Sequence, residues 1–125
     1  MVHVDTHVLV DLYLGRTRLF PRRALRLLEE NDIRVSPMVL LELRCLYELS
    51  RIKRTGHEML ADLRNRIGAE VSDASFAHIA TCAETQSWTR DPFDRVIVGN
   101  ALAENTKLLT RDPDMLEHVR FAVWD

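Results

Sequence analysis

The 125-residue sequence predicts an α/β fold: a three-layer α/β/α sandwich with a central, mostly parallel sheet of four to five strands, in one domain over residues 1–125. Short apolar runs alternate along the chain with longer segments in which apolar residues recur at helical spacing. Signals for helix starts follow several of these runs directly, as expected where each strand leads into a crossover helix. No linker, repeat or low-complexity segment divides the chain.

The first half of the chain predicts two strands, each followed by two helices. A strand over residues 2–5 leads into a helix over residues 7–14, which Gly15 ends, and a second helix runs from Pro21 to Asn31. A strand over residues 33–35 comes next. Ser36 and Pro37 then supply a capping hydroxyl and a proline at the first helical position. The helix that they begin extends to about residue 49, and another covers residues 57–66.

The second half continues the alternation. A weak strand over residues 69–71 precedes a helix that begins at Asp73 or Ser75 and runs through residue 83. Asp91 and Pro92 repeat the cap-then-proline signal and predict a helix over residues 93–104. Residues 107–110 predict a fourth strand, and residues 121–124 a fifth.

Composition favours a cytoplasmic globular protein. Hydrophobic residues make up 46% and charged residues 29% of the chain, and no apolar run approaches the roughly 20 residues that span a bilayer. The chain starts without a signal-peptide pattern. Cys45 and Cys82 fall in predicted helices and are interpreted as reduced core residues.

The net charge of −2 conceals an asymmetry between the two halves. Residues 1–68 hold 12 Lys or Arg against 9 Asp or Glu, whereas residues 69–125 hold 5 against 10. Two basic clusters stand out, and each is either a solvated helix face or a patch that steers a polyanion. Their members are Arg16, Arg18, Arg22, Arg23 and Arg26, and then Arg51, Lys53 and Arg54.

Four acids are predicted to converge at one edge of the sheet. Asp5 ends the first strand and Asp112 follows the fourth, so both emerge at the carboxyl edge, where sites form in open parallel sheets. Glu42 lies inside an apolar helix, and Asp94 lies in the first turn of the helix after Pro92. Close carboxylates repel one another, and a divalent cation such as magnesium or manganese relieves that repulsion.

Each acid also has a purely structural interpretation. Asp5 and Asp112 can cap the following segment, Asp94 can interact with a helix dipole, and Glu42 can pair with Arg44 or Arg95. Capping is the favoured interpretation for one more acid, Asp91. The remaining acids of interest are interpreted as surface or capping residues: Asp11, Asp73 and Asp114.

Four segments together resemble the PIN-domain family, and more narrowly its VapC-type toxins. The first three are residues 4–9 (VDTHVL), 35–43 (VSPMVLLEL) and 90–95 (RDPFDR), and the last is residues 108–113 (LLTRDP). The resemblance implies that Asp5, Glu42, Asp94 and Asp112 are catalytic and bind the metal. It also implies supporting roles for Thr6, Asp91, Arg95 and Thr110, with Arg95 pairing with an acid or contacting phosphate. His7 departs from the pattern, because the family usually has asparagine there, and we interpret it as a tolerated substitution.

The resemblance implies an endoribonuclease that uses Mg²⁺ or Mn²⁺ to activate water for attack on RNA phosphodiesters, leaving a 5′-phosphate. It further implies a homodimer and a VapB-like antitoxin partner that lays a segment across the acidic groove, with part of the interface from the apolar residues 39–49 and 59–67. The alternatives are a PIN nuclease of general RNA processing and a non-catalytic module with the PIN fold. A phosphotransfer receiver or phosphatase fits poorly, since His7 stands where a phosphatase needs its second aspartate.

Overall fold

The computed structural model describes all 125 residues as an α/β sandwich. The strands are β1 (Val2–Val4), β2 (Ile33–Val35), β3 (Glu70–Val71), β4 (Lys107–Leu109) and β5 (Ala122–Val123). The helices are α1 (Thr6–Leu14), α2 (Arg22–Glu30), α3 (Pro37–Glu48), α4 (Gly56–Ile67), α5 (Phe76–Glu84), α6 (Pro92–Ala103) and α7 (Pro113–His118). The predicted alternation is confirmed, with most boundaries within about two residues.

All five strands pair in parallel in the order β3-β2-β1-β4-β5, so the expectation of a mostly parallel sheet becomes a wholly parallel one. The chain first builds outward from β1 to β2 and β3 and then returns to place β4 on the other side of β1. The carboxyl ends of β1 and β4 therefore flank the point where the strand order reverses. Open parallel sheets form their sites at such a point.

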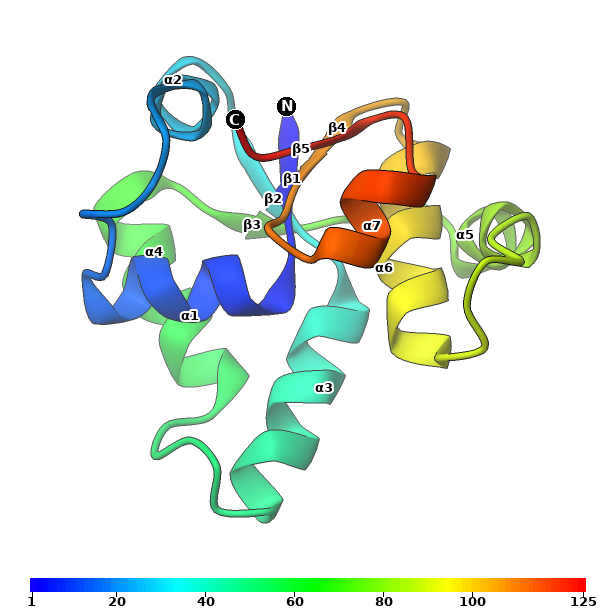
Figure 1. The fold of residues 1–125 in the computed structure, drawn as a ribbon. Coiled ribbons are helices and arrows are strands. Elements are labelled where there is room, and N and C mark those ends of the chain that lie inside the picture. Colours follow the sequence, from blue (N-terminus) through cyan, green and yellow to red (C-terminus); the bar gives the residue numbers. More distant parts are fainter.

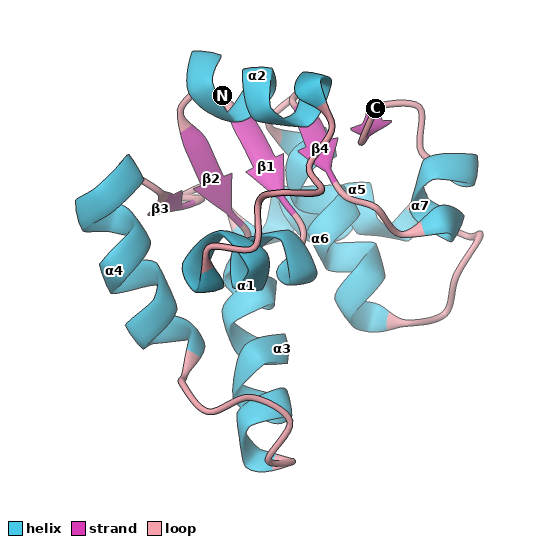
Figure 2. Cartoon of the chain, turned by 60° about the vertical axis from the view of Figure 1, so that its left-hand side comes forward, coloured by secondary structure: helices cyan, strands magenta, loops and turns pink.

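Helices cover both faces of the sheet. In Figure 1, α1, α2 and α4 lie on one side and α5 and α6 on the other, and Figure 2 shows α1 in front of the strands with α6 behind them. Helix α3 extends beyond the carboxyl ends of the strands and contacts α1, α4 and α6. None of the helices is long and apolar enough to cross a membrane.

The core fixes the helix that carries Asp94. Strand residues such as Val4 and Leu109 are fully buried, and Ile97 and Val98 of α6 pack into the same cluster. Helix α6 also lies close against α5 at Gly99. A Cβ added there would meet the backbone nitrogen of Ala83 at 2.7 Å, so only glycine allows this approach.

Two expectations need correction. The segment that Asp112 caps was interpreted as a short turn, but it is the six-residue helix α7. Cys45 and Cys82 were expected in the core, but both are only half-buried and neither belongs to the core cluster.

Candidate active site

Asp5, Glu42, Asp94 and Asp112 line one cleft of about 400 Å³ at the carboxyl edge of the sheet. Each comes from a different element: the end of β1, the second turn of α3, the first turn of α6 and the segment after β4. The structure thus brings together all four acids that the sequence singled out. A lone acid at a helix start is commonly a cap, whereas four in one cleft need a shared explanation.

Asp5 is nearly buried, and hydrogen bonds fix both of its carboxylate oxygens. Oδ1 accepts from the backbone N–H of Thr6 at 2.8 Å, which makes Asp5 the N-cap of α1. Oδ2 accepts from the Thr110 hydroxyl at 2.7 Å. The same hydroxyl oxygen accepts from the backbone N–H of Asp112 at 3.1 Å, so Thr110 joins the ends of β1 and β4.

Glu42 is held toward the same cleft by a second hydroxyl. The Thr6 side chain donates a hydrogen bond to Glu42 Oε1, and no arginine pairs with this carboxylate. The alternative interpretation, in which Glu42 pairs with Arg44 or Arg95, is therefore wrong. Burial raises the pKa of Glu42, the Thr6 hydrogen bond lowers it, and the nearby charges of Asp5 and Asp91 raise it.

Asp94 is affected both by burial and by the negative charges around the cleft. Its pKa is raised to about 7, first by burial and then by the charges of the four acids around it: Asp91, Asp5, Asp112 and Glu42. At neutral pH the Asp94 carboxyl group is therefore partly protonated and partly ionised. Such a shift is typical of a group in a functional site.

Asp112 and Asp91 both cap helices. Asp112 Oδ1 accepts from the backbone N–H of Asp114 at 2.8 Å, which leaves its other oxygen free of protein donors. Asp91 accepts from the N–H of Phe93 at 2.8 Å, as favoured from the sequence, and it does not line the cleft. Its charge nevertheless acts on Asp94.

Arg95 does not form the expected ion pair with an acid. Its Nε donates to the carbonyl oxygen of Thr89 at 2.8 Å, and the side chain does not line the cleft. Its role as a partner of an acid or of phosphate was implied by the family resemblance alone. One residue along a helix is a turn of about 100°, so neighbours in sequence face different directions.

His7 links β1 to the segment after β4. Its Nε2 accepts from the backbone N–H of Arg111 at 3.1 Å, while Nδ1 lies 3.4 Å from Asp5 Oδ2. Burial lowers the pKa of His7 against the opposing effect of Asp5. The neutral ring therefore carries its proton on Nδ1, where it faces the carboxylate. Histidine thus supplies one donor and one acceptor at this position.

The sequence interpretation missed one ion pair in the cleft. Asp11 is buried and pairs with Arg111, whereas the sequence suggested a surface or capping residue. Asp11 follows His7 by four residues, which places both on the same face of α1, and this spacing was the available signal. The cleft is further lined by Arg16 and Arg51, one from each basic cluster.

The donor set suits a hard divalent cation, because all four groups are carboxylates and solvent can supply the remaining ligands. No three His, Cys, Asp or Glu side chains already stand at metal-coordinating spacing. Hydrogen bonds from Thr6 and from the α7 backbone hold Glu42 and Asp112 in their present positions. Cation binding would bring the carboxylates closer together and would favour the ionised form of Asp94.

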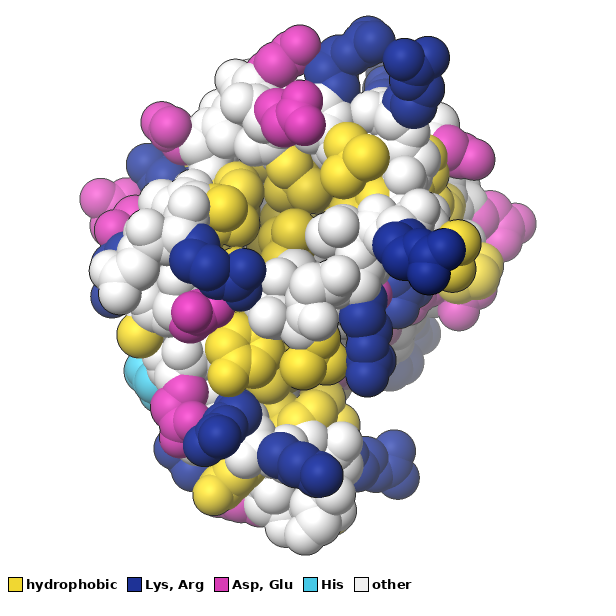
Figure 3. Space-filling model, turned by 90° about the vertical axis from the view of Figure 1, so that its left-hand side faces the viewer, with side chains coloured by type: hydrophobic (Ala, Val, Ile, Leu, Met, Phe, Trp, Pro, Cys, Tyr) yellow, Lys and Arg dark blue, Asp and Glu magenta, His cyan; other side chains and the backbone are white.

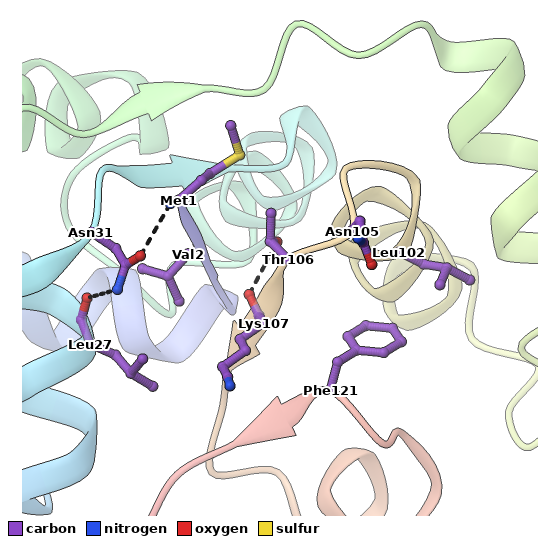
Figure 4. Close-up of a pocket in the computed structure, with 9 residues that line it drawn as sticks. All are labelled: Met1, Val2, Leu27, Asn31, Leu102, Asn105, Thr106, Lys107 and Phe121. Atoms are coloured by element: carbon purple, nitrogen blue, oxygen red, sulfur yellow. Dashed lines mark hydrogen bonds between the residues drawn. The ribbon is translucent and has the colours of Figure 1, made fainter.

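Another cavity, of about 510 Å³, lies at the amino ends of β1 and β4 (Figure 4). It contains Lys107 but no acid, and its other side chains are neutral. It therefore lacks the converging acids that distinguish the cleft. The acidic cleft is the candidate active site.

An all-parallel α/β sandwich with an acidic cleft where the strand order reverses is an arrangement that can hold a divalent cation. The family model of the PIN domain matches residues 2–122, so the chain belongs to the PIN domain family. PIN domain proteins are generally nucleases and generally use divalent metals.

Three solved structures share this fold. VapBC2 from Rickettsia felis, bound to a DNA fragment from its promoter, is 22% identical with a TM-score of 0.65, and the match covers 100% of both chains. A toxin–antitoxin complex from Klebsiella pneumoniae is 18% identical with a TM-score of 0.63, over 98% of this chain and 96% of that one. FitAcB from Neisseria gonorrhoeae is 18% identical with a TM-score of 0.52, over 100% and 97%. No curated protein gives a significant sequence match.

Proposed function

We propose that the protein is a Mg²⁺- or Mn²⁺-dependent endoribonuclease and the toxin of a VapBC-type toxin–antitoxin pair. The observation that carries the proposal is the convergence of Asp5, Glu42, Asp94 and Asp112 in one cleft, with the pKa of Asp94 raised to about 7. Membership of the PIN family supports the nuclease activity. The likeness in fold to VapBC2 and to a toxin–antitoxin complex supports the toxin role.

In this proposal the four acids hold the cation, and two threonines position them. Thr110 orients Asp5 and the backbone at Asp112, and Thr6 orients Glu42. When bound, the cation supplies a nucleophilic water at neutral pH and offsets charge on the phosphate. Asp91 supports the site through its charge and the start of α6.

The proposed antitoxin and second copy require exposed apolar surface. In the two apolar stretches expected at that interface, some side chains are buried and others are exposed. Val39 and Leu43 of α3 and Leu63 of α4 are buried in the core. The apolar side chains left exposed on these helices and on the loop after α3 are Leu41, Tyr47, Leu49 and Ile67. These exposed positions are the ones that we propose contact a VapB-like antitoxin or the partner copy.

The test is cleavage of a defined pool of single-stranded RNAs, with and without Mg²⁺, with the product ends mapped. We expect metal-dependent internal cuts that leave 5′-phosphates, and loss of cleavage in Asp5→Asn and Asp94→Asn proteins. Asp114→Asn is the matched control, because Asp114 is an exposed acid outside the cleft. Absence of cleavage by folded wild-type protein with either metal would contradict the proposal and favour a non-catalytic binding module.

A further inference from the structure

The acidic cleft continues into a second hollow along the face formed by α1 and the α3–α4 segment. This hollow, which we call the basic groove, has a volume of about 370 Å³, and its main side chains are Tyr13, Arg16, Arg51, Ile52, Lys53 and Arg54. The cleft and the basic groove share lining residues, including Arg16 and Arg51. A strand that extends from the acids into the groove therefore passes Arg16 and Arg51.

The cations of the basic groove are largely without counterions. Arg16, Arg51 and Lys53 are exposed and form no ion pair, and Arg54 lies 3.8 Å from Glu58 with both side chains more than half exposed. An exposed pair of this kind contributes little and leaves the guanidinium available. In Figure 3, Lys and Arg side chains border hydrophobic surface on this face of the molecule. The groove thus attracts anions immediately beside a cleft of acids.

The floor of the groove is apolar and contains an aromatic ring. Met59 is buried, and Ile52 and Tyr13 are half-buried, beneath the charged rim. A cationic rim over an aromatic and apolar floor is the combination that binds single strands, because phosphates meet the cations while bases stack on the ring. An acidic peptide would use the cations but would leave the floor without a matching group.

We propose that the basic groove binds the single-stranded RNA that flanks the phosphate held at the acidic cleft. The identity of the strand as RNA rests on the proposed function, whereas the path of the strand rests on the geometry of the groove. Arg51 and Lys53 contact consecutive phosphates, and Tyr13 stacks on a base. The acids repel a polyanion, and the groove provides the compensating attraction.

The experiment measures binding of a short, mixed-sequence single-stranded RNA as a function of salt, in an Asp94→Asn background that prevents cleavage. The test protein carries Arg51→Gln and Lys53→Gln. The control carries Arg22→Gln and Arg26→Gln on α2, which remove the same charge from exposed residues outside the cleft and the groove. Far-UV circular dichroism and thermal melting check that both proteins fold.

The plot of log K, where K is the association constant for RNA, against log[salt] has a negative slope. We expect this slope to be shallower by about 1.4 in the test protein, since each of the two lost phosphate contacts to a single strand contributes about 0.7. The control keeps the wild-type slope. A Tyr13→Leu protein binds more weakly at every salt concentration without a change in slope. With Asp94 intact, the test protein should show a raised KM for RNA.

An unchanged slope in the test protein, or an equal fall in the control, would overturn the proposed path even if the enzyme cleaves RNA. Loss of binding to a cognate antitoxin with RNA binding unchanged would do the same and would assign the groove to a protein. Absence of cleavage, by contrast, contradicts the proposed function, and the salt dependence then still decides whether the groove binds a single strand.

Discussion

Replacing Asp94 with asparagine should stabilise the metal-free protein at high pH. The folded pKa of about 7 exceeds the ordinary value of 3.8 by about 3 pKa units, and at about 1.36 kcal/mol per unit the ionised carboxylate costs up to roughly 4 kcal/mol. Asp94 is partly exposed, so solvent screening reduces this cost. Asparagine also loses the favourable interaction of a carboxylate with the start of α6, about 0.5 kcal/mol. We expect a net gain of about 1–2 kcal/mol at pH 8.

The gain should depend on pH with a defined sign. Because the folded pKa lies above the unfolded value, the folded protein binds the proton more tightly, and lowering the pH from 8 to 5 stabilises the wild-type fold through this group. The asparagine amide of the variant cannot take up a proton, so the advantage of Asp94→Asn at pH 5 should be less than half of that at pH 8.

Urea unfolding in EDTA at pH 5 and pH 8, followed by far-UV circular dichroism, measures both values. Asp114→Asn serves as the control, because this acid lies outside the cleft and should show no comparable pH dependence. A destabilised Asp94→Asn protein at pH 8, or an equal effect at the two pH values, would refute the electrostatic account of the cleft.

Three further predictions concern the groups that support the site. Thr110→Val, which removes the hydroxyl between Asp5 and the end of β4, should lower stability by about 1–3 kcal/mol in urea unfolding and metal affinity by about 10- to 100-fold in calorimetry. Arg111→Met should cost roughly 1–3 kcal/mol by leaving Asp11 buried without its partner, and a double-mutant cycle with Asp11→Asn should show coupling; additive effects would contradict the pairing. Gly99→Ala should lower the free energy of unfolding by about 1–3 kcal/mol through its clash with the α5 backbone, and a neutral effect would contradict the packing.

Sequence patterns predicted the architecture because they depend on local physics. Apolar runs predicted the strands, and cap-then-proline signals at Ser36 and Asp91 predicted the starts of α3 and α6. The placement of Asp5 and Asp112 followed from one condition, that the first and fourth strands are neighbours, and the parallel pairing of β1 with β4 confirms it.

The remaining features depend on contacts between distant segments. Asp11 and Arg111 are 100 residues apart, and nothing in either local sequence states that they pair. Arg95 was expected to pair with an acid, but a backbone carbonyl six residues earlier takes its hydrogen bond. His7 likewise accepts a hydrogen bond from the backbone N–H of Arg111, which depends on the packing of α1 against the segment after β4.

Calorimetric titration with Mn²⁺ and Mg²⁺ tests most directly whether the four carboxylates together bind a divalent cation. We expect wild-type protein to bind at millimolar concentrations or below, with affinity rising from pH 5.5 to pH 8 as Asp94 ionises. Asp5→Asn should weaken binding by at least tenfold. No heat of binding in folded wild-type protein, or an Asp5→Asn protein that binds as tightly, would contradict the claim.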